Sequence, residues 1–262
     1  MALLTAAFVL ASLGNGLPAN AAGVPLPRPR PPIVAPPPVA VVSDHGPSTD
    51  CDNRLAAIAA FKPKPTLTGP GACGGPDLLE LDAVLLPDGA RVAVTPAATL
   101  QCGMAESFAS WIRDEVVQRL APLKSPLRAV VNEDSYECRG RNRVVGAKVS
   151  EHGKGNATDV RAFVLADGRK FVLTDVNAPK DLRLSLQESA CGRFTTVLGP
   201  GSDPYHEQHV HLDVLERHNG YRICEWAVRE PAPEAPPAVA KAQIPPPLPP
   251  PRPPLPAIAR KL

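Results

Sequence analysis

Aromatic residues are scarce in this chain of 262 residues, at 4% of the composition. A surface that stacks nucleic-acid bases needs several such side chains. The net charge of +2 is small, and no dense run of lysine and arginine offers a footprint for a phosphate backbone. The sequence therefore predicts no nucleic-acid partner.

The sequence also lacks CxxC pairs, which disfavours a zinc ribbon or a thioredoxin-type site. Its even number of dispersed cysteines predicts up to three disulfides in an exported protein. Six cysteines allow 15 pairings, and the sequence cannot choose among them. Free buried thiols in a cytosolic protein are the alternative. The six are Cys51, Cys73, Cys102, Cys138, Cys191 and Cys224.

The apolar run at the N-terminus is shorter than the about 20 residues that span a bilayer as a helix. It has the length of a signal-peptide h-region, and Ala19-Asn20-Ala21 is a small-x-small cleavage sequence. We predict a signal peptide over residues 1–21 and export to the periplasm or cell envelope of a Gram-negative bacterium. A retained membrane anchor is the alternative.

Proline, in contrast, is abundant and unevenly placed. Of the 34 prolines, 22 lie between Pro25 and Pro47 or between Pro231 and Pro256. Proline lacks the backbone N–H and fixes φ, so these flanks cannot form helices or central strands. We predict a proline-rich linker over 22–49, a disordered proline-rich tail over 231–262, and one monomeric domain over 50–230. The flanks are tethers or contact envelope components.

Within that domain, the hydrophobic pattern mixes helices and strands without regular alternation. We therefore expect an α+β fold: a small antiparallel sheet that carries the functional site, flanked by helices and braced by disulfides. Segment 78–84 is ambiguous. Helices are predicted at 53–61, 104–120 and 182–191, strands at 91–94, 127–132 and 210–214, and a β-hairpin at 162–165 and 170–173.

Two clusters of polar residues are candidates for metal binding. In the first, two of the residues between His152 and Asp159 are glycines, which favours a loop that turns both side chains toward one point. The second, 206–211, holds three of the six histidines, and strand alternation places His209 and His211 on one face. Each cluster alone has another interpretation. A lone histidine is usually structural, and an HxH pair also binds nickel or copper adventitiously. Glycine-rich loops that end in aspartate are common turns. The two clusters together predict a metal site.

The ligand set predicted from these clusters is His152, Asp159 and His211, holding one zinc ion per domain. Three protein ligands leave a fourth position for water, which is typical of catalytic zinc, whereas structural sites are usually closed by four. Zinc lowers the pKa of its bound water to about 7. His209 is the first candidate for the base that takes the proton, with Glu207 and His206 as alternatives.

The same residues resemble two related groups of proteins. Ser150-x-His152-x-x-Gly155-x-Ala157-x-Asp159 followed by His209-x-His211 is similar to the zinc peptidases of the lysostaphin and D-alanyl-D-alanine metallopeptidase group. The bacterial extensin-like C-terminal domain family is the closer match. Its pattern over residues 50–226 is read in Tyr136-Glu137-Cys138-Arg139, Ser150-Glu151-His152, the stretch 191–201, and His206-Glu207-Gln208-His209-Val210-His211-Leu212-Asp213.

The resemblance implies the same three zinc ligands and adds roles for their neighbours. His209 would be the general base or stabilise the transition state. Arg139 would bind a substrate carboxylate or polarise the scissile carbonyl. Ser150 would orient the substrate or the ligand loop, and His206 matches a histidine of some wall endopeptidases. Gln208 stands where other relatives carry a glutamate base, which leaves the identity of the base open.

The function expected from the resemblance is a zinc-dependent hydrolase of D-amino-acid-containing peptidoglycan peptides, either a carboxypeptidase or an endopeptidase. One alternative is a non-catalytic peptidoglycan-binding or envelope-structural module that keeps the metal site. Another is a zinc hydrolase that acts on a different envelope polymer.

Overall fold

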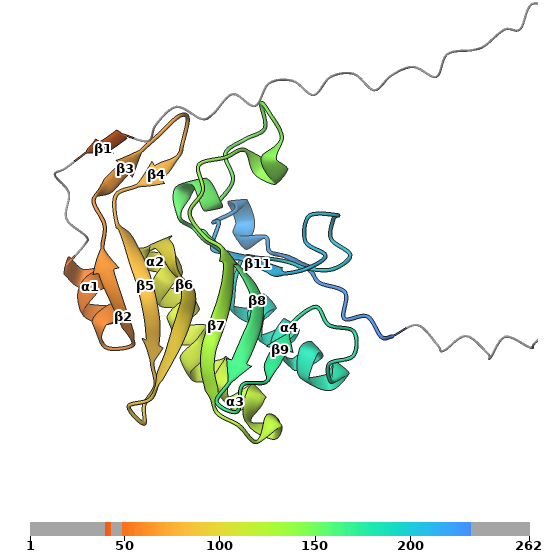
Figure 1. Ribbon diagram of the computed structural model, residues 1–262. Coiled ribbons are helices and arrows are strands. Elements are labelled where there is room, and N and C mark those ends of the chain that lie inside the picture. The colour runs from red at the N-terminus through yellow and green to blue at the C-terminus, as the bar shows by residue number, and fades with distance from the viewer. Residues whose placement is uncertain (1–39, 43–48, 232–262) are drawn as a thin grey trace, which may run out of the picture. The chain divides into compact units, whose positions relative to one another are not determined.

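The computed structural model describes residues 40–42 and 49–231 (Figure 1). The predicted signal peptide and most of the two proline-rich flanks lie outside these residues. Within the described part, two sheets form. The smaller sheet has the order β1-β3-β4, with β1 Ala40–Val42, β3 Thr66–Thr68 and β4 Gly74–Gly75. No helix in the described ranges is both long and apolar enough to cross a membrane.

The main sheet has nine strands among the described residues, and eight follow the order β12-β10-β11-β8-β7-β6-β5-β2, while β9 pairs with β8. Two pairs are parallel, β6 with β7 and β10 with β12. The expected small antiparallel sheet is therefore wrong on both size and direction. The strands are β2 (Ala59–Pro63), β5 (Leu78–Leu85), β6 (Arg91–Gln101), β7 (Leu127–Asp134), β8 (Ala157–Leu165), β9 (Lys170–Val172), β10 (Thr196–Leu198), β11 (Val210–Asp213) and β12 (Ile223–Glu225).

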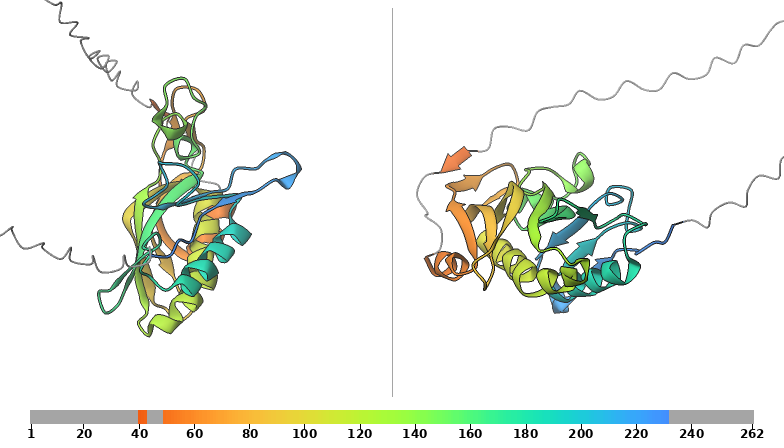
Figure 2. Two further views of the ribbon diagram at one scale, coloured as in Figure 1. Left: turned by 90° about the vertical axis from the view of Figure 1, so that its right-hand side faces the viewer. Right: turned by 60° about the horizontal axis from the view of Figure 1, so that its bottom comes forward.

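A helical crossover explains the parallel pair β6 and β7. After β6 the chain continues as α2 (Cys102–Trp111), a π-helical turn (Ile112–Val116) and α3 (Val117–Leu120), which carry it back so that β7 starts at the same end of the sheet. This confirms the helix predicted at 104–120. Its apolar face is fully buried, and Figure 2 shows the helices along one face of the sheet.

Two further α-helices lie in the described part, α1 (Thr49–Ala56) and α4 (Lys180–Arg193). The prediction of a helix through 53–61 is wrong in its second half, because Ala59–Pro63 pairs with β5 as β2. The hydrogen bonds of an available sheet edge override the local helical spacing there. The predicted helix at 182–191 and the hairpin of β8 and β9 are confirmed.

The six cysteines form the three disulfides that the sequence predicts in number. The bonds are Cys51–Cys102, Cys73–Cys138 and Cys191–Cys224, with Cα–Cα distances of 6.2, 5.5 and 5.6 Å. All three distances suit a disulfide. The first ties α1 to the start of α2, and the last ties α4 to β12. The second lies beside the ligand loop described below.

Candidate metal centre

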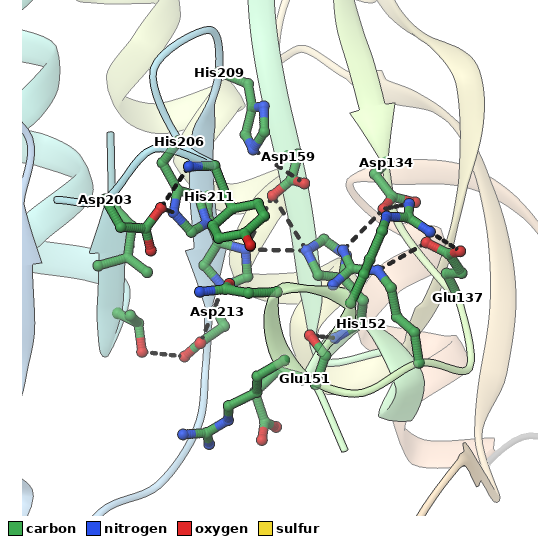
Figure 3. Close-up of a pocket in the computed structure, with 18 of the residues that line it drawn as sticks. Asp134, Glu137, Glu151, His152, Asp159, Asp203, His206, His209, His211 and Asp213 are labelled. Carbon is green, nitrogen blue, oxygen red and sulfur yellow. Dashed lines mark hydrogen bonds and ion pairs between the residues drawn. The ribbon is translucent and has the colours of Figure 1, made fainter. Parts of the chain in front are cut away.

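The three predicted ligands meet at one buried point (Figure 3). Asp159 in β8 and His211 in β11 are directly opposite each other in the antiparallel pair. His152 begins a helical turn that precedes β8. Asp159 Oδ1 lies 2.9 Å from His211 Nδ1 and 3.2 Å from His152 Nε2, and these two nitrogens are 3.0 Å apart. The three donor atoms form a compact triangle that could hold a metal ion.

The size and chemistry of this triangle fit zinc. Bonds of about 2.0–2.2 Å at tetrahedral angles separate donor atoms by about 3.3–3.6 Å. The edges of the triangle are slightly shorter, so a small outward movement of the side chains would accommodate the ion. Two imidazoles and one carboxylate are also a donor set that zinc accepts.

The turn that presents His152 depends on Gly155. This residue has φ +74°, and its carbonyl oxygen accepts a hydrogen bond of 2.7 Å from the backbone N–H of Gln101. A Cβ at this position would lie 2.4 Å from Leu78 Cδ2. The glycine therefore allows both the left-handed backbone and the close approach of the loop to the end of β6.

Neighbouring groups fix the rotation of both ligand imidazoles. His152 Nδ1 lies 2.6 Å from the backbone carbonyl oxygen of Ser135, which directs Nε2 toward Asp159. His211 Nε2 lies 3.2 Å from Asp213 Oδ2, which directs Nδ1 toward Asp159. Metal-binding histidines commonly donate their second ring N–H to such a partner. Both rings therefore present one nitrogen to the triangle.

The electrostatics of the triangle favour a positive charge at its centre. Burial lowers the pKa of His211, but the hydrogen bonds that its ring donates to Asp159 and Asp213, together with the charges of these carboxylates, outweigh burial and raise it to about 9. Burial raises the pKa of Asp159, but the bonds from His152 and His211 hold it well below its usual range. A divalent cation would supply this positive charge in place of the proton on His211.

The triangle lies in a cleft of about 650 Å³. His209 and His206 also line this cleft, as do four arginines and several carboxylates. The donor atoms are thus buried on the protein side and face a cleft on the other. This is the arrangement expected of a site that keeps one position for water or substrate.

Comparison with known proteins adds one match. A sequence pattern described as the extensin-like protein C-terminus matches residues 49–225. The chain belongs to the extensin-like C-terminus family. The matched range contains the three candidate ligands and all six cysteines. No curated protein and no solved structure matches the chain, and no match supports the resemblance to lysostaphin-type peptidases.

In this extensin-like domain, the two histidines predicted as bases lie beside the ligands. His209 Nε2 is 3.3 Å from Asp159 Oδ2, and the His209 side chain is 16% exposed. His206 Nδ1 is 2.7 Å from Asp203 Oδ1. Burial, together with the nearby charge of His211, lowers the pKa of His206 despite the opposing effect of Asp203. Both imidazoles therefore lie at the cleft beside the donor triangle.

Glu207, the third candidate base, points elsewhere. Its carboxylate accepts hydrogen bonds of 2.7 and 3.1 Å from Arg229 and one of 2.9 Å from the backbone N–H of Gly201. The residue is exposed and is not among those that line the cleft. The structure therefore does not bring Glu207 to the ligands.

Arg139 and Ser150, predicted to bind substrate, both line the cleft. Arg139 Nε donates to Glu137 over 2.7 Å, and one of its terminal nitrogens donates to Asp134 over 3.1 Å. These two carboxylates hold the guanidinium in place. Ser150 is buried, and its backbone N–H donates to the carbonyl oxygen of Arg139 over 2.9 Å, which ties the ligand loop to the arginine.

Two carboxylates of the site were missed in the sequence. Asp213 contacts His211 and Asp203 contacts His206. Asp213 follows His211 by two residues in the same strand, so the alternation that pairs His209 with His211 also places Asp213 on that face. Asp203 precedes His206 in a loop, where no period predicts a contact.

Proposed function

We propose that this domain is a zinc-dependent hydrolase that binds one zinc ion through His152, Asp159 and His211. The observation that carries the proposal is the convergence of three buried donor atoms, from two neighbouring strands and a turn, at the floor of a cleft. Three protein donors match catalytic zinc sites, which leave one position for water.

The residues around the triangle suit hydrolysis. Held by His152, Asp159 and His211, zinc would supply a water that ionises near neutral pH and would polarise a substrate carbonyl. His209 would be the base, since its Nε2 is adjacent to Asp159 and its ring is reachable from the cleft. Arg139 binds a carboxylate or the developing negative charge of the substrate through guanidinium hydrogen bonds. Ser150 holds the ligand loop against that arginine.

We propose D-amino-acid-containing stem or cross-link peptides of peptidoglycan as the substrate, and the periplasm or cell envelope of a Gram-negative bacterium as the location. Support comes from the motif likeness to lysostaphin and D-alanyl-D-alanine metallopeptidases, from the Arg139 guanidinium at the cleft, and from the predicted signal peptide. Three disulfides suit an oxidising compartment.

The test is digestion of defined muropeptides by the purified chain in the presence of zinc, with the products identified by mass. We expect a new peptide product that is lost in His209→Ala and retained in His218→Ala, a matched change of an exposed histidine outside the cleft. No product from the zinc-loaded wild type refutes the hydrolase. Product formation that is equal in both variants refutes the role of His209.

A second candidate is a peptidoglycan-binding module that keeps the metal but does not turn over. The observation that favours it is the lack of a carboxylate base near the ligands in segment 206–211: Glu207 is paired with Arg229, and Gln208 is an exposed amide. Binding to purified cell-wall sacculi that persists in His209→Ala, without release of peptides, would support this module.

A further inference from the structure

Asp213 is a buried carboxylate that contacts the candidate ligand His211 on the side of its ring away from the donor triangle. It is 4% exposed and lies in β11 on the same face as His211. Its Oδ2 lies 3.2 Å from His211 Nε2, the ring nitrogen opposite the one that faces Asp159. Asp213 therefore touches the ligand without being part of the donor triangle.

The other carboxylate oxygen of Asp213 is fully engaged by donors. Oδ1 accepts a hydrogen bond of 2.5 Å from the hydroxyl of Thr196, which is its partner across the β10–β11 pair. It also accepts a bond of 3.0 Å from the backbone N–H of Leu215. These bonds fix the carboxylate rotation, so that Oδ2 remains directed at the imidazole of His211.

A third residue, Arg217, sets the direction of these hydrogen bonds. One terminal nitrogen of Arg217 donates to Thr196 Oγ1 over 2.6 Å, and the other donates to the backbone carbonyl oxygen of Thr195 over 3.0 Å. Arginine has no acceptor, so the single hydroxyl hydrogen of Thr196 must be given to Asp213. Asp213 in turn can only accept from His211, which places a hydrogen on Nε2 and leaves Nδ1 as the nitrogen for a metal.

The two ligand histidines differ in this respect. His152 is held by the backbone carbonyl oxygen of Ser135, a neutral group, whereas His211 is held by a carboxylate. A carboxylate partner increases the basicity of an imidazole ligand more than a neutral acceptor does. Among the described residues of the cleft, Asp213 is the side chain placed to tune a metal ligand in this way.

We infer that Arg217, Thr196 and Asp213 form a positioning relay that fixes the tautomer and orientation of His211 and strengthens metal binding. The relay rests on the metal site proposed above and extends it to residues outside the donor triangle. Asp213→Asn tests it sharply. The amide keeps the size of the carboxylate but can donate to Nε2. This stabilises the tautomer with hydrogen on Nδ1, which cannot bind a metal through the nitrogen that faces the triangle.

The experiment measures zinc affinity of the full chain by competition with a chromogenic chelator. We expect Asp213→Asn to weaken binding about 10–100-fold, and Thr196→Val to weaken it less, because Asp213 remains but loses one of its restraints. The matched control is Asp203→Asn, which removes a carboxylate that contacts a cleft histidine outside the triangle, and we expect it to leave zinc affinity unchanged. The visible spectrum of bound Co²⁺ should change in Asp213→Asn and not in Asp203→Asn.

Each outcome decides a separate point. Wild-type zinc affinity in folded Asp213→Asn overturns the relay. A loss of zinc affinity in Asp203→Asn equal to that in Asp213→Asn also overturns it, because that result would show only a general effect of the charge in the cleft. If Asp213→Asn does not fold, unchanged affinity in Thr196→Val overturns the relay and weakened affinity supports it. A wild-type chain that binds no zinc overturns the relay together with the metal site. Zinc binding without hydrolysis refutes the proposed hydrolase and leaves the relay standing.

Discussion

Substitution of Gly155 by alanine should damage both the stability of the domain and its metal binding. The left-handed backbone at this position costs a residue with a Cβ about 1–2 kcal/mol. The new Cβ would also lie 2.4 Å from Leu78 Cδ2 and 3.0 Å from the backbone nitrogen of Gln101. Overpacking of this kind costs about 1–3 kcal/mol. The free energy of unfolding should therefore fall by about 2–5 kcal/mol.

Gly168 provides the matched control, because it has φ +86° and a Cβ added there would meet no atom within 4 Å. Gly168→Ala should lose only the backbone contribution of about 1–2 kcal/mol. Urea unfolding of both variants measures the two losses. Equal losses would refute the claim that the ligand loop is crowded against β5 and β6.

The same substitution should affect the metal site, since Gly155 lies three residues after His152. Relief of the crowding would move the turn and displace His152 Nε2 from the donor triangle. We expect zinc affinity in Gly155→Ala to fall about tenfold, which corresponds to about 1.4 kcal/mol. Gly168→Ala should bind zinc like the wild type. A loss of zinc affinity in that variant would contradict the claim that the affinity depends on the geometry of the ligand loop.

Two further predictions concern stability. Burial raises the pKa of Glu115, but hydrogen bonds from Ser189 and Arg193 outweigh burial and lower it. The contribution of Glu115 to the free energy of unfolding is therefore present above its unfolded pKa and is lost as the pH falls through the lowered folded pKa. Glu115→Gln should lower the free energy of unfolding at pH 7 by about 1 kcal/mol. In urea unfolding, the difference from the wild type should shrink as the pH is lowered below about 4.3, and a difference that does not change with pH would contradict this reasoning. Replacing Cys73 and Cys138 together by serine should lower the free energy of unfolding by about 2–5 kcal/mol in urea unfolding. It should also weaken zinc binding, because this disulfide lies against the ligand loop. Unchanged zinc affinity would contradict the claim that the disulfide supports the ligand loop.

The residues of the donor triangle could be predicted from the sequence, because each cluster follows a local pattern, although His211 lies 52 and 59 positions from its two partners. Strand alternation places His211 on a defined face, and the glycines before Asp159 predict a loop that turns back. The structure brings these three residues together in one buried group.

The architecture of the sheet could not be predicted in the same way. Strands β10 and β12 are three residues long, too short for a period to be recognised, and their parallel pairing joins residues far apart in the chain. The segment 59–61 has helical spacing but forms a strand because an edge of β5 is available. Disulfide pairing and the contact of Asp203 with His206 likewise depend on the folded chain.

The position of His211 directly opposite Asp159 in the β8–β11 pair has a consequence for folding. A slip of one residue between these strands would turn His211 to the other face of the sheet and separate the donor atoms. Chains paired with a one-residue slip would then lack the site. Metal binding would therefore stabilise the native register selectively, because only correctly paired chains gain the free energy of metal binding.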